Sequence, residues 1–416
     1  MGWYHPLVFG YLKSYLSAYL PGAVEMERAD TLQDVTDCDL LAISSTSQDY
    51  NVACKIAAYA KQANPHVVTV LGGHHVSYLP KTLAEQFDVG VLGEGEATFL
   101  DVVKACLAGS DISGVPGIAY HGDGGVVVTQ SRCPITPMDS IPIPYRDAGQ
   151  QTYLMSSRGC PYHCTFCTST TFWKKARFFS AGYVLEDIKA ISAIIGRRAT
   201  ITVQDDLFIA DAKRFERIVG LIEDAGMSNT TDFSFSVRAN LVTDDLCRLI
   251  NRIHVSNLCF GAESGSDRIL KLMGKGTTAA MNQRAIDTMC AHGFPVTCSF
   301  IVGWPTETEA EVRSTYEFIA RNQRDGKLSD TSAVNVLMPM PGTAVWDYAV
   351  ANGLVATDGF DWDRLGIWAC HKHSTAGSFD EWVEGRRSNR SVYLNEATLP
   401  AGRLYGIMAE YETARA

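Results

Sequence analysis

Three thiols lie close together in the stretch Ser157-Arg158-Gly159-Cys160-Pro161-Tyr162-His163-Cys164-Thr165-Phe166-Cys167, at the spacing C-x3-C-x2-C. A short loop with this spacing can curl three sulfur atoms around one object. Three thiolates can hold three irons of a [4Fe–4S] cube and leave the fourth iron without a protein ligand. An open iron can accept a substrate, as an open position does in other catalytic metal sites. We therefore interpret Cys160, Cys164 and Cys167 as cluster ligands.

Two simpler interpretations of the three thiols are small buried side chains and half of a zinc site. A zinc site needs a fourth ligand, and His163 is the nearest candidate. His163 stands between ligand cysteines, where a loop wrapped round a metal leaves it little reach, and no second C-x2-C follows. Core packing does not explain so polar a loop with glycine and proline in it. The pattern therefore favours the cluster.

Composition and charge limit the classes of protein. The 416 residues suffice for two or three domains, and the hydrophobic and charged fractions are typical of a soluble globular protein. A net charge of −10 without basic runs argues against nucleic acid as a partner. The first twenty residues are too polar to span a membrane, and we expect neither a secretory signal nor a membrane partner. Most of the twelve scattered cysteines lie inside strand or helix patterns, which predicts buried free thiols in a reducing compartment, the cytoplasm.

The first third of the chain alternates strand and helix patterns, which predicts a Rossmann-like parallel sheet. Glycines follow the second and third strands, where ligands of such sheets bind. The expected strands are 39–44, 67–71 and 89–92, the expected helices are 5–19, 50–62 and 97–107, and 117–129 is expected to form a hairpin.

Six further strand patterns, separated by helix patterns, predict a curved parallel sheet or open barrel. In such folds the chemistry lies at the carboxyl ends of the strands. The cysteine loop and several polar residues occupy those positions, which predicts a site there. The expected strands are 153–156, 199–203, 233–237, 257–261, 296–303 and 332–338.

The segment from Pro134 to Pro144 has four prolines and no periodicity, which predicts a linker. Near the C-terminus, aromatic residues precede the cluster Cys370-His371-Lys372-His373. This region is either a substrate cap, in which Cys370 or His371 donates a proton or hydrogen atom, or a surface tail with a buried cysteine. The expected division is 1–133 for the Rossmann-like domain, 134–147 for the linker, 148–345 for the core and 346–416 for a C-terminal extension.

The cysteine motif resembles that of the radical S-adenosylmethionine (SAM) enzymes, in which an aromatic residue, here Phe166, precedes the last cysteine. The resemblance continues at the later strand ends, with one departure: Thr306 stands where the family usually has glycine. It implies a partial (β/α)6 barrel that binds a [4Fe–4S] cluster and SAM. The residues that it implies as cofactor contacts are Phe166, Gln204, Arg238, Glu263, Ser264, Val302 and Gly303.

The N-terminal segment resembles the cobalamin-binding domain that precedes many radical SAM cores. Gly72-Gly73-His74 and Gly93-Glu94-Gly95-Glu96 follow successive strands, as in that domain. No D-x-H-x-x-G marks a lower ligand of cobalt, although many relatives also lack it. His74 and His75 could contact a ligand, but a histidine after a strand is more often an ordinary loop residue. The usual first strand is not recognised, so we expect a truncated sheet that does not retain cobalamin.

The radical SAM resemblance implies one-electron cleavage of SAM and a 5′-deoxyadenosyl radical that abstracts hydrogen from an unactivated carbon. Our main expectation is cobalamin-independent dehydration of a small polar natural product, resembling the diol-dehydratases of aminoglycoside biosynthesis that act on aminosugars. The alternative is a C-methyltransferase, in which the substrate radical takes a methyl group from cobalamin. A third interpretation, an iron–sulfur electron carrier or redox sensor, does not need the SAM motifs.

The dehydration hypothesis gives catalytic roles to several residues. A carboxylate at Asp205, Asp206 or Glu263 would accept a hydroxyl proton, and Cys370 would donate to the substrate. Each alone has an ordinary structural explanation, such as a helix cap, which is what we expect of Asp211. The resemblance further implies a small-molecule substrate and an external one-electron reductant of the flavodoxin or ferredoxin type.

Overall fold

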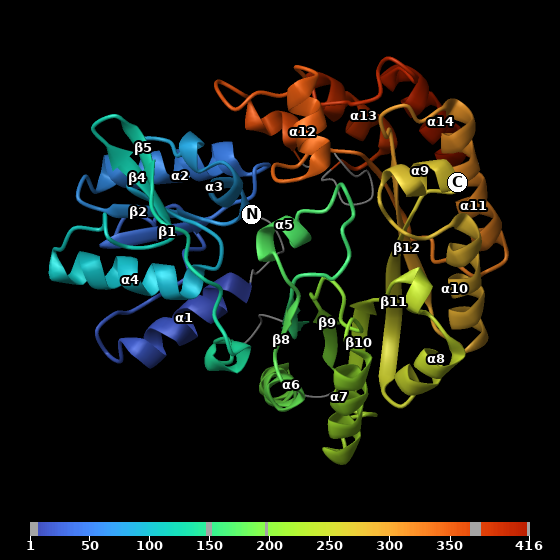
Figure 1. Ribbon diagram of the computed structural model, residues 1–416, viewed down its shortest axis with the longest axis horizontal. Coiled ribbons are helices and arrows are strands. Elements are labelled where there is room, and N and C mark those ends of the chain that lie inside the picture. Colours follow the sequence, from blue (N-terminus) through green and yellow to red (C-terminus); the bar gives the residue numbers. More distant parts are fainter. Residues whose placement is uncertain (1–6, 147–151, 196–198, 367–375, 414–416) are drawn as a thin grey trace. The chain divides into compact units, whose positions relative to one another are not determined.

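A computed structural model describes residues 7–146, 152–195, 199–366 and 376–413 of the chain (Figure 1). The chain divides into two compact units. The first comprises residues 1–151 and 356–363, and the second comprises residues 152–355 and 364–416. Each unit is built around a sheet with parallel strands, which confirms the predicted α/β class.

The first unit contains a five-stranded sheet in the order β1-β2-β3-β4-β5. The first three strands are parallel, and the predicted hairpin extends them in the antiparallel sense. Helices α1 and α4 pack together on one face, and α2 and α3 lie on the other (Figure 1). The bounds are α1 Leu7–Tyr19, β1 Leu40–Ser44, α2 Tyr50–Ala63, β2 Val68–Gly72, α3 His74–Tyr78, β3 Val89–Val91, α4 Gly95–Ala108, β4 Ile118–Gly122 and β5 Gly125–Val128, with 3-10 turns at Pro80–Thr82 and Met138–Ser140.

His75 is a packing residue of this first unit. Its ring is fully buried and stacks on Tyr50 with 3.7 Å between centroids. Nδ1 lies 2.9 Å from the Ser47 hydroxyl, and Nε2 lies 2.9 Å from the Thr82 hydroxyl. Trp362, from the segment that returns to this unit late in the chain, packs edge-on against the same ring. Burial lowers the pKa of His75 to about 3, so the ring is neutral at physiological pH.

The second unit contains a sheet of six parallel strands in the order β13-β12-β11-β10-β9-β6, as the six strand patterns predict. Helices α10 and α11 cover the outer side of β11 and β12 (Figure 1). The strands are β6 Tyr153–Leu154, β9 Ala199–Val203, β10 Thr231–Ser236, β11 His254–Glu263, β12 Val296–Val302 and β13 Ala333–Val336. The helices are α5 Ser169–Trp173, α6 Ala181–Ile195, α7 Ala212–Asp224, α8 Asp244–Ile250, α9 Asp267–Leu272, α10 Ala279–Ala291, α11 Glu309–Arg324, α12 Ala344–Ala351, α13 Phe379–Ser388 and α14 Ala401–Thr413, with 3-10 turns at Ala239–Leu241 and Trp362–Leu365.

The first strand of the core is shorter than the expected 153–156, because β6 ends at Leu154. After β6 the chain forms a separate two-stranded antiparallel sheet, in which β7 (Ser157–Arg158) pairs with β8 (Arg177–Phe178). This small sheet joins the two ends of the cysteine loop. Within the described ranges, no helix has both the length and the apolar character needed to cross a membrane.

Candidate active site

Two contacts hold the cysteine loop. Gly159 fixes its start, and Thr165 is bound to the segment that follows α9 in the same chain. Gly159 has φ of +88°, and a Cβ there would lie 2.8 Å from the Lys175 carbonyl oxygen, so a side chain does not fit. The Thr165 amide donates to the Met273 carbonyl at 3.0 Å. The loop is thus fixed at both places before any cofactor binds.

The three thiols fit a cluster better than a single metal ion. Cys160, Cys164 and Cys167 are all partly buried, and burial raises the pKa of Cys160 and of Cys167. His163, the fourth ligand of the zinc interpretation, is exposed. In the described part of the chain no three His, Cys, Asp or Glu side chains form a site for one ion. Each thiolate of a cubane binds its own iron, so the sulfurs need not converge on one point.

Asp205 connects the end of β9 to the start of the cysteine loop. Its buried carboxylate accepts from the Ser156 amide and the hydroxyls of Ser156 and Ser157, each at 2.6 Å. Arg214 supports the same segment by donating to the Ser156 carbonyl at 2.6 Å. Burial raises the pKa of Asp205 while these hydrogen bonds oppose the shift. The contacts make Asp205 a positioning residue for the loop.

Asp206 and Arg238 contact the loop from two further strand ends. The exposed Asp206 accepts from the Gly159 amide at 3.1 Å. Arg238, which follows β10 and is 7% exposed, places its guanidinium carbon 3.7 Å from the centroid of the Tyr162 ring. Its Nη1 lies 3.8 Å from the sulfur of Cys164. Both residues therefore stand beside the thiols, as the sequence pattern predicts.

Glu263 lies at the end of β11 in a strained conformation, with φ of +62° at a break in the strand register. Lys275 donates to its carboxylate at 2.7 Å, and both side chains are buried. The Lys275 ammonium also lies 6.0 Å from the centre of the Phe166 ring, so the pair reaches the cysteine loop. Glu263 is consequently engaged in a buried ion pair with Lys275.

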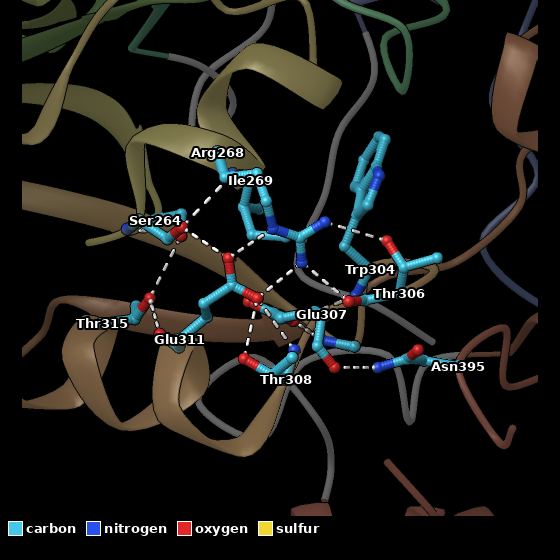
Figure 2. Close-up of polar contacts among 12 residues, drawn as sticks. Ser264, Arg268, Ile269, Trp304, Thr306, Glu307, Thr308, Glu311, Thr315 and Asn395 are labelled. Carbon is cyan, nitrogen blue, oxygen red and sulfur yellow. Dashed lines mark hydrogen bonds and ion pairs between the residues drawn. The ribbon is translucent and has the colours of Figure 1, made fainter. Parts of the chain in front are cut away.

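A polar network joins the ends of β11 and β12 (Figure 2). Ser264 contacts the Thr315 hydroxyl at 3.2 Å. Arg268 binds both oxygens of Glu311 and holds the pKa of that carboxyl at about 2. It also donates to the carbonyl of Thr306 at 2.7 Å and to its hydroxyl at 3.1 Å. Thr306 has φ of +68°, a conformation that suits glycine, and these two bonds account for a β-branched residue there.

Glu307 closes the turn after β12. Its buried carboxylate accepts from the amides of Gly303 at 2.6 Å and Trp304 at 3.1 Å, while Oε1 has no partner among the described residues. Asn395 donates to the Glu307 backbone carbonyl at 2.7 Å (Figure 2). Burial, the largest cause, raises the pKa of Glu307 to about 7. Trp304 packs edge-on against Phe166, with 6.2 Å between centroids, which joins this turn to the cysteine loop.

The structure thus brings the ends of four strands, β9, β10, β11 and β12, to one loop, with Gln204, Val302 and Gly303 at the ends of β9 and β12. Cys370 and His371 lie outside the described residues. Sequence reasoning missed Lys275. Gly274 and Gly276, which flank it, both have positive φ, but only the structure shows this. The predicted helix cap at Asp211 is confirmed, since its side chain accepts from the Arg214 amide at 3.0 Å.

Replacing Asp205 by alanine should leave three buried donors unpaired at the start of the cysteine loop. We expect Asp205→Ala to cost about 2–3 kcal/mol of stability and to lose most of the iron taken up on anaerobic reconstitution. Iron and sulfide assays per chain measure this. Asp211→Ala is the matched control, because it removes a carboxylate after the same strand and should cost about 1 kcal/mol without loss of iron. Equal iron in both variants would contradict the role of Asp205.

Glu307 should make stability depend on pH. Its folded-state pKa of about 7 exceeds the ordinary value of 4.5, so the folded chain binds the proton more tightly and loses stability as pH rises from 4.5 to 7. Glu307→Gln cannot titrate, so its stability relative to the native chain should rise by up to about 3 kcal/mol over that window. Urea unfolding from about pH 5 to about pH 8, followed by tryptophan fluorescence, tests this. A difference that is constant with pH would disprove it.

Comparisons with known proteins identify both units. The radical SAM superfamily model matches residues 154–319, and the B12 binding domain model matches residues 2–103. An uncharacterized methyltransferase of Pyrococcus horikoshii is 32% identical over 77% of this chain and 71% of its own length. An anaerobic magnesium-protoporphyrin IX monomethyl ester cyclase of Rubrivivax gelatinosus is 31% identical over 62% of this chain, which spans only half of the cyclase.

A solved structure shows the same fold. The radical SAM methyltransferase TsrM from Kitasatospora setae, with cobalamin and a [4Fe-4S] cluster bound, superposes with a TM-score of 0.70. It is 15% identical and covers 84% of this chain and 75% of its own. At this identity the likeness concerns the fold alone.

These findings overturn two expectations from the sequence. Cobalamin-independent dehydration was the wrong main hypothesis, because the relatives found by sequence are named as a methyltransferase and a cyclase. The doubt about cobalamin was also misplaced, because the B12 binding domain model matches despite the unrecognised first strand. The proton-accepting roles of Asp205, Asp206 and Glu263 were part of the dehydration hypothesis, and we do not retain them. The chain belongs to the radical SAM superfamily, whose domain binds SAM and a [4Fe–4S] cluster, and it carries a B12 binding domain ahead of that core.

Proposed function

We propose that this chain is a cobalamin-dependent radical SAM methyltransferase. The observation that carries the proposal is the presence of a B12 binding domain and a radical SAM domain in one chain. The similarity to a methyltransferase at 32% identity, over most of both chains, supports the same reaction class.

The relatives support a reaction class for this chain, but they do not identify the molecule that accepts the methyl group. One relative is named only as a methyltransferase, another acts on a magnesium porphyrin, and the chain spans half of the latter. The proposal therefore takes a small molecule as the acceptor and an external one-electron carrier as the reductant. Transfer of the SAM methyl group leaves S-adenosylhomocysteine, so this product marks the reaction.

The residues present suit both cofactors. Cys160, Cys164 and Cys167 would hold the cluster. In the first unit, Gly72 and Gly93 leave the strand ends open: a Cβ at Gly93 would meet nothing within 4 Å, and one at Gly72 only the Ile43 carbonyl oxygen at 4.0 Å. A cofactor can thus approach the backbone at the edge where such sheets bind ligands.

His75 would not be a ligand of cobalt, because both ring nitrogens have hydroxyl partners inside the packed core. The absence of D-x-H-x-x-G from the sequence agrees with this arrangement. Cobalamin in this unit would be held without coordination by His75. A substitution at His75 would act on the folding of the unit and not on a bond to cobalt.

When bound, the cluster and SAM supply one-electron chemistry and cobalamin supplies a carrier for the methyl group. The chain's own residues bind and aim these groups. We assign SAM contacts to Gln204, Ser264 and the backbone of Val302 and Gly303, which stand at the ends of β9, β11 and β12. Phe166 and Trp304 would form an apolar wall beside the cluster. The Lys275–Glu263 ion pair would lie next to that wall.

Methyl-labelled SAM tests the proposal. The anaerobically reconstituted chain, given hydroxocobalamin, a chemical reductant and SAM with a deuterated methyl group, should release S-adenosylhomocysteine and pass the label to the bound cobalamin, read by mass spectrometry. Cys167→Ala, which removes a cluster ligand, should abolish reductive cleavage of SAM, whereas Cys133→Ala, at an exposed thiol, should not. Formation of 5′-deoxyadenosine with no label on cobalamin would reject methyl transfer.

A further inference from the structure

Arg238 occupies an unusual position for a guanidinium group. It is buried, it lies flat against Tyr162 inside the cysteine loop, and its Nη1 lies within hydrogen-bonding distance of the Cys164 sulfur. The Nε atom is buried without a hydrogen-bond partner among the described residues. Within the described part of the chain, no carboxylate lies within ion-pair distance of Arg238, so its charge is not compensated by an ion pair there.

The other charges near the thiols have different effects. Lys275 and Glu263 neutralise each other at 2.7 Å. Asp206 accepts from the Gly159 amide at 3.1 Å, so its negative charge lies beside the start of the cysteine loop. Asp206 is exposed and therefore screened by water, whereas Arg238 is buried and acts through a lower dielectric. Arg238 thus brings a buried positive charge within 3.8 Å of the Cys164 sulfur.

We propose that Arg238 raises the reduction potential of the cluster by donating a charge-assisted hydrogen bond to the Cys164 thiolate, and that Tyr162 holds it there. In this step one electron passes from the external reductant to the cluster, and no bond is made or broken. The reduced cluster carries one more negative charge, so a buried cation at a ligand sulfur stabilises it more than the oxidised form. The inference rests on the cluster site and not on methyl transfer.

The test is a redox titration of the cluster-loaded chain, followed by electron paramagnetic resonance and without SAM, cobalamin or acceptor. Arg238→Gln should shift the midpoint potential to lower values, and Arg238→Lys should shift it less because the charge remains. Asp206→Asn should shift it in the opposite direction by a smaller amount. Arg248→Gln, at an exposed arginine of α8 in the same unit, is the matched control and should leave it unchanged.

Iron and sulfide per chain are measured for each variant, so that a potential is compared only between fully loaded proteins. An unchanged potential in fully loaded Arg238→Gln would overturn the proposal. Where that variant fails to take up iron, Tyr162→Leu replaces it: the guanidinium stays but loses its stacking partner, and the potential should fall. An unchanged potential in fully loaded Tyr162→Leu would equally overturn it. Because no methyl acceptor is present, these outcomes are separate from those of the labelled-SAM experiment.

Discussion

The buried carboxylate of Asp205 is the contact on which the site depends. It takes three hydrogen bonds from Ser156 and Ser157, the residues that lead into the cysteine loop, and so fixes that loop to the end of β9. A buried carboxylate is stable only when such donors surround it. The loop therefore starts from a defined position, and the contacts from β10, β11 and β12 act on a segment that is already held. Iron binding then needs little further ordering of the chain.

The remaining strand ends approach the loop through side chains of contrasting kinds. Arg238 brings an uncompensated cation, Glu263 brings a carboxylate already paired with Lys275, and Trp304 brings an aromatic edge to Phe166. The network of Arg268, Glu311 and Thr306 holds the β12 turn in a conformation that costs energy for threonine. Strain and buried charge thus concentrate at one edge of the sheet, where cofactors of parallel folds bind.

The sequence predicted the architecture well because strand–helix alternation and the cysteine spacing are local signals. It predicted less about individual side chains. An aspartate after a strand gives the same sequence pattern whether it binds a ligand or a neighbouring loop. Only the structure shows that Ser156 and Ser157 surround the Asp205 carboxylate. Lys275 lies after α9, far from any motif, and reaches Glu263 through the turn that follows that helix. The glycine motifs that follow β2 and β3 were better indicators of a B12 binding domain than the unrecognised first strand was of its loss.

We propose that one chain holds both an open cluster and cobalamin. Stoichiometry tests it most directly: the chain is reconstituted anaerobically with iron and sulfide, incubated with hydroxocobalamin and desalted, and then assayed for iron and, by its absorbance spectrum, for cobalamin. We predict about four irons and about one cobalamin per chain, with cobalamin retained in a variant that lacks the cluster cysteines. A full complement of iron with no cobalamin would contradict the account and would leave the first unit as a scaffold without its ligand.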